Sequence, residues 1–127
     1  MIGYTTLGAS DHERANAFYA PIAEELGARR MPVSEHLTLW GDPRRGGMLG
    51  IITPNNREPP TVGNGVMVAL KATGVAAVQA AHAAALAAGG ADEGPPGPRP
   101  ADSTSFYGAY FRDPTGNKLC VFTSPSA

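Results

Sequence analysis

The sequence carries one pattern twice, a strand followed by a helix and then by several short strands. Tyr4 lies in a strand-like segment six residues before Ser10, and Met67 lies in another six residues before Thr73. Ser10 and Thr73 each precede an amphipathic stretch, so Tyr4 and Met67 are equivalent positions of an internal repeat. Two such units side by side can enclose a cleft between curved sheets. We therefore expect an α+β fold of two βαβββ modules with curved mixed sheets.

The first unit has recognisable helix signals. Ser10 and Glu13 form a potential capping box, and Gly27 is a natural helix stop. The apolar residues between them recur at helical spacing and form one stripe, namely Ala15, Phe18, Tyr19, Ile22 and Leu26. Short strands are expected before and after this helix, over residues 1–9, 28–33, 36–41 and 48–53.

The second unit follows a segment rich in Pro and Asn. Residues 66–70 are strand-like, Thr73 is a potential helix cap, and Gly89 with Gly90 ends the helix. One face of that helix is expected to contain Val75, Val78, His82, Ala85 and Leu86. A Gly- and Pro-rich loop is expected over residues 93–100, followed by a hairpin over residues 106–122 that turns at 113–117.

Length and composition limit the classes of protein. A chain of 127 residues is expected to form a single domain over 1–127, with module one at about 1–54, a linker at about 55–64 and module two at about 65–124. The net charge of −1 and the lack of a Lys/Arg cluster argue against a nucleic-acid partner. The sequence has no membrane-length apolar run and only one cysteine, so we expect a cytoplasmic protein without disulfides.

The segment from Asp113 to Asn117 reads Asp-Pro-Thr-Gly-Asn. It closely resembles the hairpin that ends proteins of the glyoxalase, bleomycin-resistance and extradiol-dioxygenase group, the vicinal oxygen chelate superfamily. The resemblance extends to the opening strand, to the helix with Ser10-Asp11 and Phe18-Tyr19, to the linker and to the second helix. It implies the duplicated βαβββ fold, and also a homodimer, because members of the group commonly pair through their sheets or helices.

The resemblance also implies three positions for metal ligands. Metal-using members usually place His at the positions of Tyr4 and Met67, and Glu at the position of Cys120. Glyoxalase-type members often add a Glu in the last strand of the first half, but residues 44–54 contain no Asp, Glu or His. A phenol, a thioether and one thiol are a poor donor set for a divalent catalytic ion. We therefore expect a metal-free site without a cofactor; the simplest alternative is that these residues only pack.

A cleft lined by these three residues suits a flat or hydrophobic small molecule. The candidate pocket residues are Tyr4, Trp40, Met67, Tyr107, Tyr110 and Cys120. Trp40, Tyr107 and Tyr110 are its candidate walls, although an aromatic residue taken alone is more typical of a core or dimer contact. Of the histidines, His12 is expected to be exposed, His82 to be packed and His36 to lie near the cleft mouth. None has a second imidazole or a carboxylate at ligand-like spacing.

Three functional hypotheses follow. The first is a protein of the bleomycin-resistance-like branch that binds a small hydrophobic or aromatic molecule by sequestration. The second is a metal-dependent or cofactorless lyase, isomerase or dioxygenase that uses Tyr4 or Cys120. The third is a module kept for protein contacts alone.

The reactivity of Cys120 bears on the second hypothesis. A nucleophilic cysteine needs a base or a positive charge nearby to populate its thiolate. Lys118 on the same strand face is only weak support for this, so we expect an inert thiol.

Overall fold

The computed structural model describes residues 1–125 and contains two four-stranded sheets, each with its own helix. In each sheet the first strand pairs in parallel with the last, and the remaining pairs are antiparallel. This is the predicted pair of βαβββ modules.

The elements have the following bounds. The first module comprises β1 (Tyr4–Gly8), α1 (His12–Leu26), β2 (Arg29–Ser34), β3 (Leu37–Gly41) and β4 (Met48–Ile52). The second comprises β5 (Val68–Lys71), α2 (Val75–Ala87), β6 (Ala91–Pro98), β7 (Tyr107–Arg112) and β8 (Lys118–Thr123). The first sheet has the order β1-β4-β3-β2 and the second has the order β5-β8-β7-β6.

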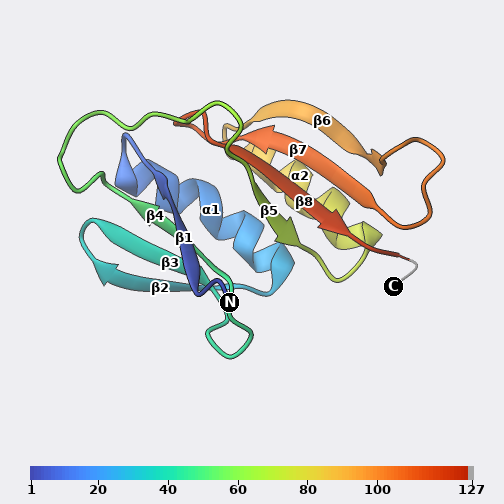
Figure 1. Cartoon of the computed structure of the whole chain (residues 1–127), viewed down its shortest axis with the longest axis horizontal. Coiled ribbons are helices and arrows are strands. Elements are labelled where there is room, and N and C mark those ends of the chain that lie inside the picture. The colour runs from blue at the N-terminus through green and yellow to red at the C-terminus, as the bar shows by residue number, and fades with distance from the viewer. Residues whose placement is uncertain (126–127) are drawn as a thin grey trace.

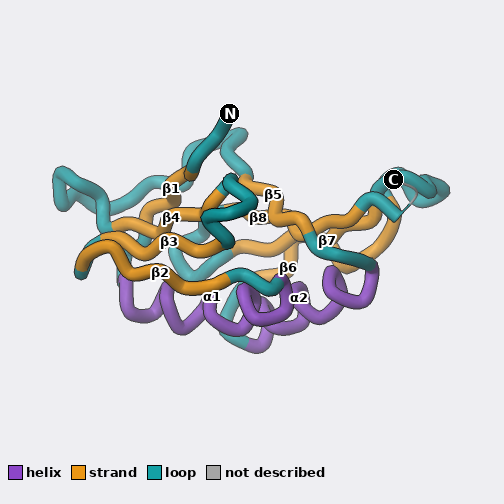
Figure 2. The backbone as a smooth tube through the Cα atoms, turned by 90° about the horizontal axis from the view of Figure 1, so that it is seen from below, coloured by secondary structure: helices purple, strands orange, loops and turns teal. Residues whose placement is uncertain are grey.

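The sheets lie side by side with β1 and β5 nearest the middle of the molecule (Figure 1). Both helices lie on the same side of the strand layer (Figure 2). The core therefore forms between the helices and one face of each sheet, and we call the opposite face the helix-free face. Within residues 1–125, neither helix is long and apolar enough to cross a membrane.

Helix α1 begins one residue later than the capping-box prediction implied. Asp11 is the N-cap, and its carboxylate accepts a hydrogen bond from the backbone N–H of Arg14 at 3.0 Å. Ser10 instead bonds Thr115 through its backbone N–H, at 3.1 Å. The Ser10 cap was wrong because a distant partner competes for that residue. The end at Gly27 is confirmed, and its φ of 67° is one that glycine adopts without strain.

Helix α2 has a weaker start. Its N-cap is Gly74, which has no side chain to bond the first turn, so the predicted Thr73 cap was also wrong. The buried residues are Val78, Ala81, His82 and Ala85. Leu86 was predicted on this face but is exposed. The helix is so rich in alanine that spacing alone does not identify its buried face.

The loop predicted over residues 93–100 was wrong, because most of that segment belongs to strand β6. It pairs only with β7, along the outer edge of the second sheet, and its register shifts twice, between Asp92 and Gly94 and between Gly94 and Gly97. Proline is tolerated at such an edge because the N–H that it lacks would point away from the sheet. The edge position therefore explains how a segment with this composition forms a strand.

The turn between β7 and β8 joins the two modules. Asp113 is buried, and its Oδ1 accepts hydrogen bonds from the backbone N–H groups of the next turn residues, Thr115, Gly116 and Asn117. Its Oδ2 accepts a 2.6 Å bond from the hydroxyl of Tyr19 in α1. The Asn117 side chain donates to the carbonyl of Gly8 at 2.8 Å. The hairpin turn thus holds both α1 and the end of β1.

Candidate functional site

The helix-free face of the second sheet contains Cys120. Its neighbours Leu119 and Val121 are buried in the core beneath the helices, so Cys120 points to the opposite face. Tyr110 on β7 and Ala69 on β5 pair with Cys120 across the two adjacent strands. The register therefore places the predicted pocket residues Tyr110 and Cys120 next to each other on one face.

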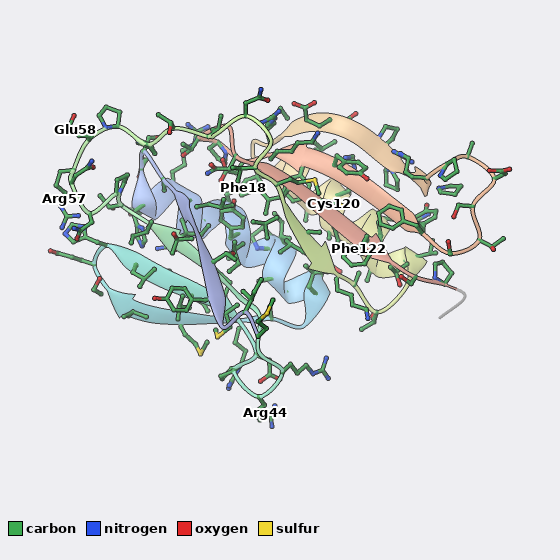
Figure 3. All side chains as sticks on the ribbon, viewed as in Figure 1. Phe18, Arg44, Arg57, Glu58, Cys120 and Phe122 are labelled. Carbon is green, nitrogen blue, oxygen red and sulfur yellow. The ribbon has the colours of Figure 1, made fainter. Side chains whose placement is uncertain are left out.

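The thiol of Cys120 is almost completely covered, with 1% of the residue exposed. Burial raises the pKa of this thiol, although Tyr110, Arg99 and Lys118 act in the opposite direction. Burial, together with the neighbouring Cys120, also raises the pKa of the Tyr110 hydroxyl. Both groups therefore keep their protons at neutral pH, which makes Cys120 a weak nucleophile. In Figure 3 Cys120 and Phe122 are seen along β8.

Tyr4 and Met67 are exposed, by 57% and 43% respectively. Met67, just before β5, lies beside Lys118 and Arg112 at the β7–β8 turn, and this turn also holds Gly8 at the end of β1. Tyr4, at the start of β1, pairs with Met48. β1 and β5 run in opposite directions (Figure 1), so within one chain Tyr4 and Met67 lie at opposite ends of the two central strands.

Trp40 and Tyr107 lie on the helix side of their sheets. Trp40 is buried in the core and its ring centroid lies 6.4 Å from that of Tyr19. It also lines a small apolar cavity of about 50 Å³ between α1 and both sheets, which Leu70 reaches from β5. Tyr107 packs against the core, and its hydroxyl accepts a 3.0 Å bond from Gln79 of α2. These two residues are therefore separated from Tyr110 and Cys120 by the sheet layer.

A groove on the helix-free side joins Met67, a predicted pocket residue, with linker residues that the sequence did not point to. It has a volume of about 530 Å³ and we call it the linker groove. It is lined by residues 62–67, the last part of the connection between β4 and β5, together with Arg112 and Lys118. Val62, Val66 and Met67 expose large apolar side chains there. The two-residue spacing of Lys118 and Cys120 already places both side chains on one face of the strand. No local pattern, however, shows that the linker passes over Lys118.

The histidines are scattered over the molecule. His12 is half-buried rather than exposed, and its Nε2 lies 3.0 Å from the Thr38 hydroxyl. Burial, followed by the charges of His36 and Arg30, lowers its pKa. His82 is buried, as predicted, and contacts Asp92 at 3.1 Å. His36 lies between β2 and β3, beside Glu35. Within residues 1–125, no three His, Cys, Asp or Glu side chains are grouped closely enough to hold a metal ion.

The three positions that the resemblance assigned to metal ligands do not fit a metal. Tyr4 and Met67 offer a phenol and a thioether, and the Cys120 thiol is covered and keeps its proton because burial raises its pKa. A phenol and a thioether are weak ligands for the hard or borderline divalent ions of catalytic sites. These three side chains are therefore not suited to support a metal-dependent reaction step.

Comparison with known proteins agrees with this architecture. The family model described as the Glyoxalase/Bleomycin resistance protein/Dioxygenase superfamily matches residues 1–121. A search of curated protein sequences gave no significant match. The crystal structure of a glyoxalase/bleomycin resistance protein from Albidiferax ferrireducens T118 is similar, with 35% identity and a TM-score of 0.87. That alignment covers 98% of this chain and 99% of the other.

Two more distant structures share the fold alone. A glyoxalase/bleomycin resistance protein/dioxygenase family enzyme from Burkholderia phytofirmans PsJN is 18% identical, covers 96% of this chain and 97% of its own, and has a TM-score of 0.74. A lactoylglutathione lyase from Agrobacterium tumefaciens is 22% identical, covers 99% of this chain and 95% of its own, and has a TM-score of 0.68.

Proposed function

Because the chain belongs to the glyoxalase/bleomycin resistance protein/dioxygenase superfamily, we propose that it binds a small hydrophobic or aromatic molecule in a metal-free cleft on the helix-free side of its sheets. The observation that carries this proposal is the set of side chains at the three family ligand positions. Tyr4, Met67 and Cys120 offer an exposed phenol, an exposed thioether and a buried thiol. The exposed phenol and thioether suit apolar contact with a ligand better than coordination of an ion.

We further propose that two copies of the chain complete the cleft. Tyr4 and Met67 are both exposed, but they lie at opposite ends of the two central strands. A two-fold axis exchanges equivalent surfaces, so it can bring Tyr4 of one copy toward Met67 and Cys120 of the other. The exposed side chains of Ile2 and Val66 add apolar area for such a contact.

The first experiment tests the metal-free part of the proposal. Protein purified without chelator is analysed for bound metal and then titrated with Zn²⁺, Ni²⁺, Mn²⁺ and Fe²⁺ while its thermal unfolding is followed. An ion that binds only the folded protein must raise its stability. We expect no stoichiometric metal and no shift in Tm. Stoichiometric metal would contradict the proposal and favour a lyase, isomerase or dioxygenase.

The second experiment tests ligand binding. A screen of aromatic and apolar small molecules should contain members that raise Tm, because a ligand at 100 times its Kd stabilises by about 2.7 kcal/mol. Met67→Ser should reduce the shift, whereas Val33→Ser, a matched change at another exposed apolar residue, should not. Sedimentation equilibrium of the same protein should give a dimer. A monomer that still binds ligand would contradict the shared cleft while leaving the binding function in place.

A further inference from the structure

Positive charge is concentrated on the helix-free face of the second sheet. Lys71 on β5, Arg112 on β7 and Lys118 on β8 all point to this face, because the residues beside them in each strand pack into the core. Lys71 and Lys118 are the only lysines in the sequence. The other positions of β5, β7 and β8 that point to this face are Ala69, Gly108, Tyr110, Cys120 and Phe122. The three strands therefore present no acidic residue here.

Lys118 and Lys71 are the two cations of this face that make no ion pair with an acid in residues 1–125. The Nζ of Lys118 lies 5.7 Å from the centre of the Tyr110 ring, and its side chain is half-buried, whereas Lys71 is exposed. A charge partly removed from water interacts more strongly with an opposite charge than a fully hydrated one does. Lys118 is therefore positioned to receive an anion from outside the chain.

The two neighbouring arginines differ in how their charge is balanced. The Arg112 guanidinium contacts the Glu93 carboxylate at 2.7 Å and is neutralised by it. Arg99 also lies 5.7 Å from the Tyr110 ring centre, but it donates to the backbone carbonyls of Pro95 and Pro98, which carry no net charge. The surroundings of Tyr110 therefore keep the positive charge of both Arg99 and Lys118.

Lys118 also lines the linker groove, next to apolar side chains. Val62, Val66 and Met67 expose apolar surface along the same groove. Its volume of about 530 Å³ lies within the usual range of about 300–1,000 Å³ for small-molecule sites. The groove thus offers one cation and an apolar wall within the space of one small molecule.

We propose that the linker groove binds an organic carboxylate, with the carboxylate at Lys118 and an aromatic or aliphatic body against Val62, Val66 and Met67. This inference rests on the proposed function, since it names the chemical class of the ligand taken by the helix-free side. Arg99 adds attraction at longer range, because its charge near Tyr110 has the same sign. The geometry favours an acid over a neutral or cationic molecule of the same shape.

The test compares matched ligands and matched variants. A panel of aryl and alkyl carboxylates, including 2-naphthoate, is titrated calorimetrically beside the corresponding neutral amides. Lys118→Met removes the charge and keeps a similar apolar stem, and Arg44→Met removes a charge at the tip of the β3–β4 loop, away from Cys120 (Figure 3). We expect at least one acid to bind tenfold or more tightly than its amide. Lys118→Met should remove that preference, and Arg44→Met should retain it.

Two other results would overturn the inference, and they differ in what they say about the proposed function. Equal binding of acids and amides, unchanged in Lys118→Met, would remove the role of charge but leave an apolar binding site. No binding by either series to the wild-type protein would overturn both proposals. The salt dependence of binding needs no variant: acid binding should weaken between 50 and 500 mM NaCl, and amide binding should not.

Discussion

The hydrogen bond between Tyr19 and Asp113 is the strongest candidate for a single contact that stabilises the fold. Both residues are buried, and the bond of 2.6 Å joins a hydroxyl to a carboxylate. Tyr19→Phe removes the donor and leaves the four remaining donors to Asp113 in place. Hydrogen bonds to charged groups contribute about 1.5–3 kcal/mol, so we expect a loss of about 2 kcal/mol in the free energy of unfolding, measured by denaturant titration.

Tyr107→Phe is the matched control, because the Tyr107 hydroxyl accepts a bond from the neutral side chain of Gln79 near the surface. Its cost should stay below about 1 kcal/mol. Equal losses in the two variants would show that the bond to Asp113 contributes no more to the free energy of unfolding than the bond between Tyr107 and Gln79 does.

The same tyrosine gives a pH dependence of known sign. Burial, followed by the charge of Asp113 and its hydrogen bond, raises the pKa of Tyr19 well above 10. Above pH 10 the unfolded chain loses this proton and the folded chain keeps it, so the free energy of unfolding must fall as pH rises. We expect a shallower fall in Tyr19→Phe between pH 9.5 and 11, measured by denaturant titration at each pH. Tyr110 and Cys120 titrate in both proteins, so identical slopes would contradict the assignment to Tyr19.

The burial of Cys120 predicts a slow thiol. Only 1% of the residue is exposed and burial raises its pKa, so both access and thiolate population are low. We expect a disulfide reagent such as dithiobis-nitrobenzoate to react with the native protein at pH 8 at least 100-fold more slowly than with the protein in denaturant. Rapid reaction of the folded protein would revive the nucleophile hypothesis.

At the scale of elements, the two helices differ in how they begin. Asp11 caps α1 through its carboxylate, whereas the equivalent position of α2 is Gly74, whose backbone is extended and whose surroundings are open. Gly74→Asp should therefore stabilise the protein by about 0.5–1 kcal/mol, from a new cap bond, a favourable helix dipole and a less flexible unfolded chain. Asp11→Ala should cost about 1 kcal/mol. Thermal unfolding would measure both, and a destabilised Gly74→Asp would contradict the cap geometry.

Elements were predicted best where periodicity was clear. The stripe of α1, the turn at Asp113 and the strand segments follow from spacing and turn chemistry alone. Strand β6 was missed because its prolines and glycines are typical of loops, and only its edge position makes them compatible with a sheet. The Ser10 cap was wrong because Ser10 is bonded to Thr115, a residue far away in the sequence.

At the scale of the whole molecule, the sequence predicted the repeat but not how the repeats are joined. The alternation in β8 places Lys118 and Cys120 on one face, and this can be inferred without coordinates. The separation of Tyr4 from Met67 cannot, because it depends on the antiparallel directions of β1 and β5. Nor does any local pattern show that Trp40 and Tyr107 face the helices, since aromatic residues suit either side of a sheet.

The contacts between the modules predict that they unfold as one unit. Asn117 and Asp113 of the second module bond Gly8 and Tyr19 of the first, and Leu70 of β5 lines the same cavity as Trp40. Trp40, the sole tryptophan, reports on the first module through its fluorescence, and thiol exposure of Cys120 reports on the second. At a fixed protein concentration, we expect both signals to change at the same denaturant midpoint, the mark of a two-state transition.

Asn117→Ala makes this last prediction sharper. It removes the bond to Gly8 and one bond to Asp113, so a half-buried carbonyl and a buried carboxylate each lose a donor, at a cost of about 2–4 kcal/mol. If the modules are coupled, the change lowers the Trp40 and Cys120 midpoints together, although the substitution itself lies in the second module. A lower Cys120 midpoint with an unchanged Trp40 midpoint would instead mean that the two modules unfold independently and that the hairpin turn serves the second module alone.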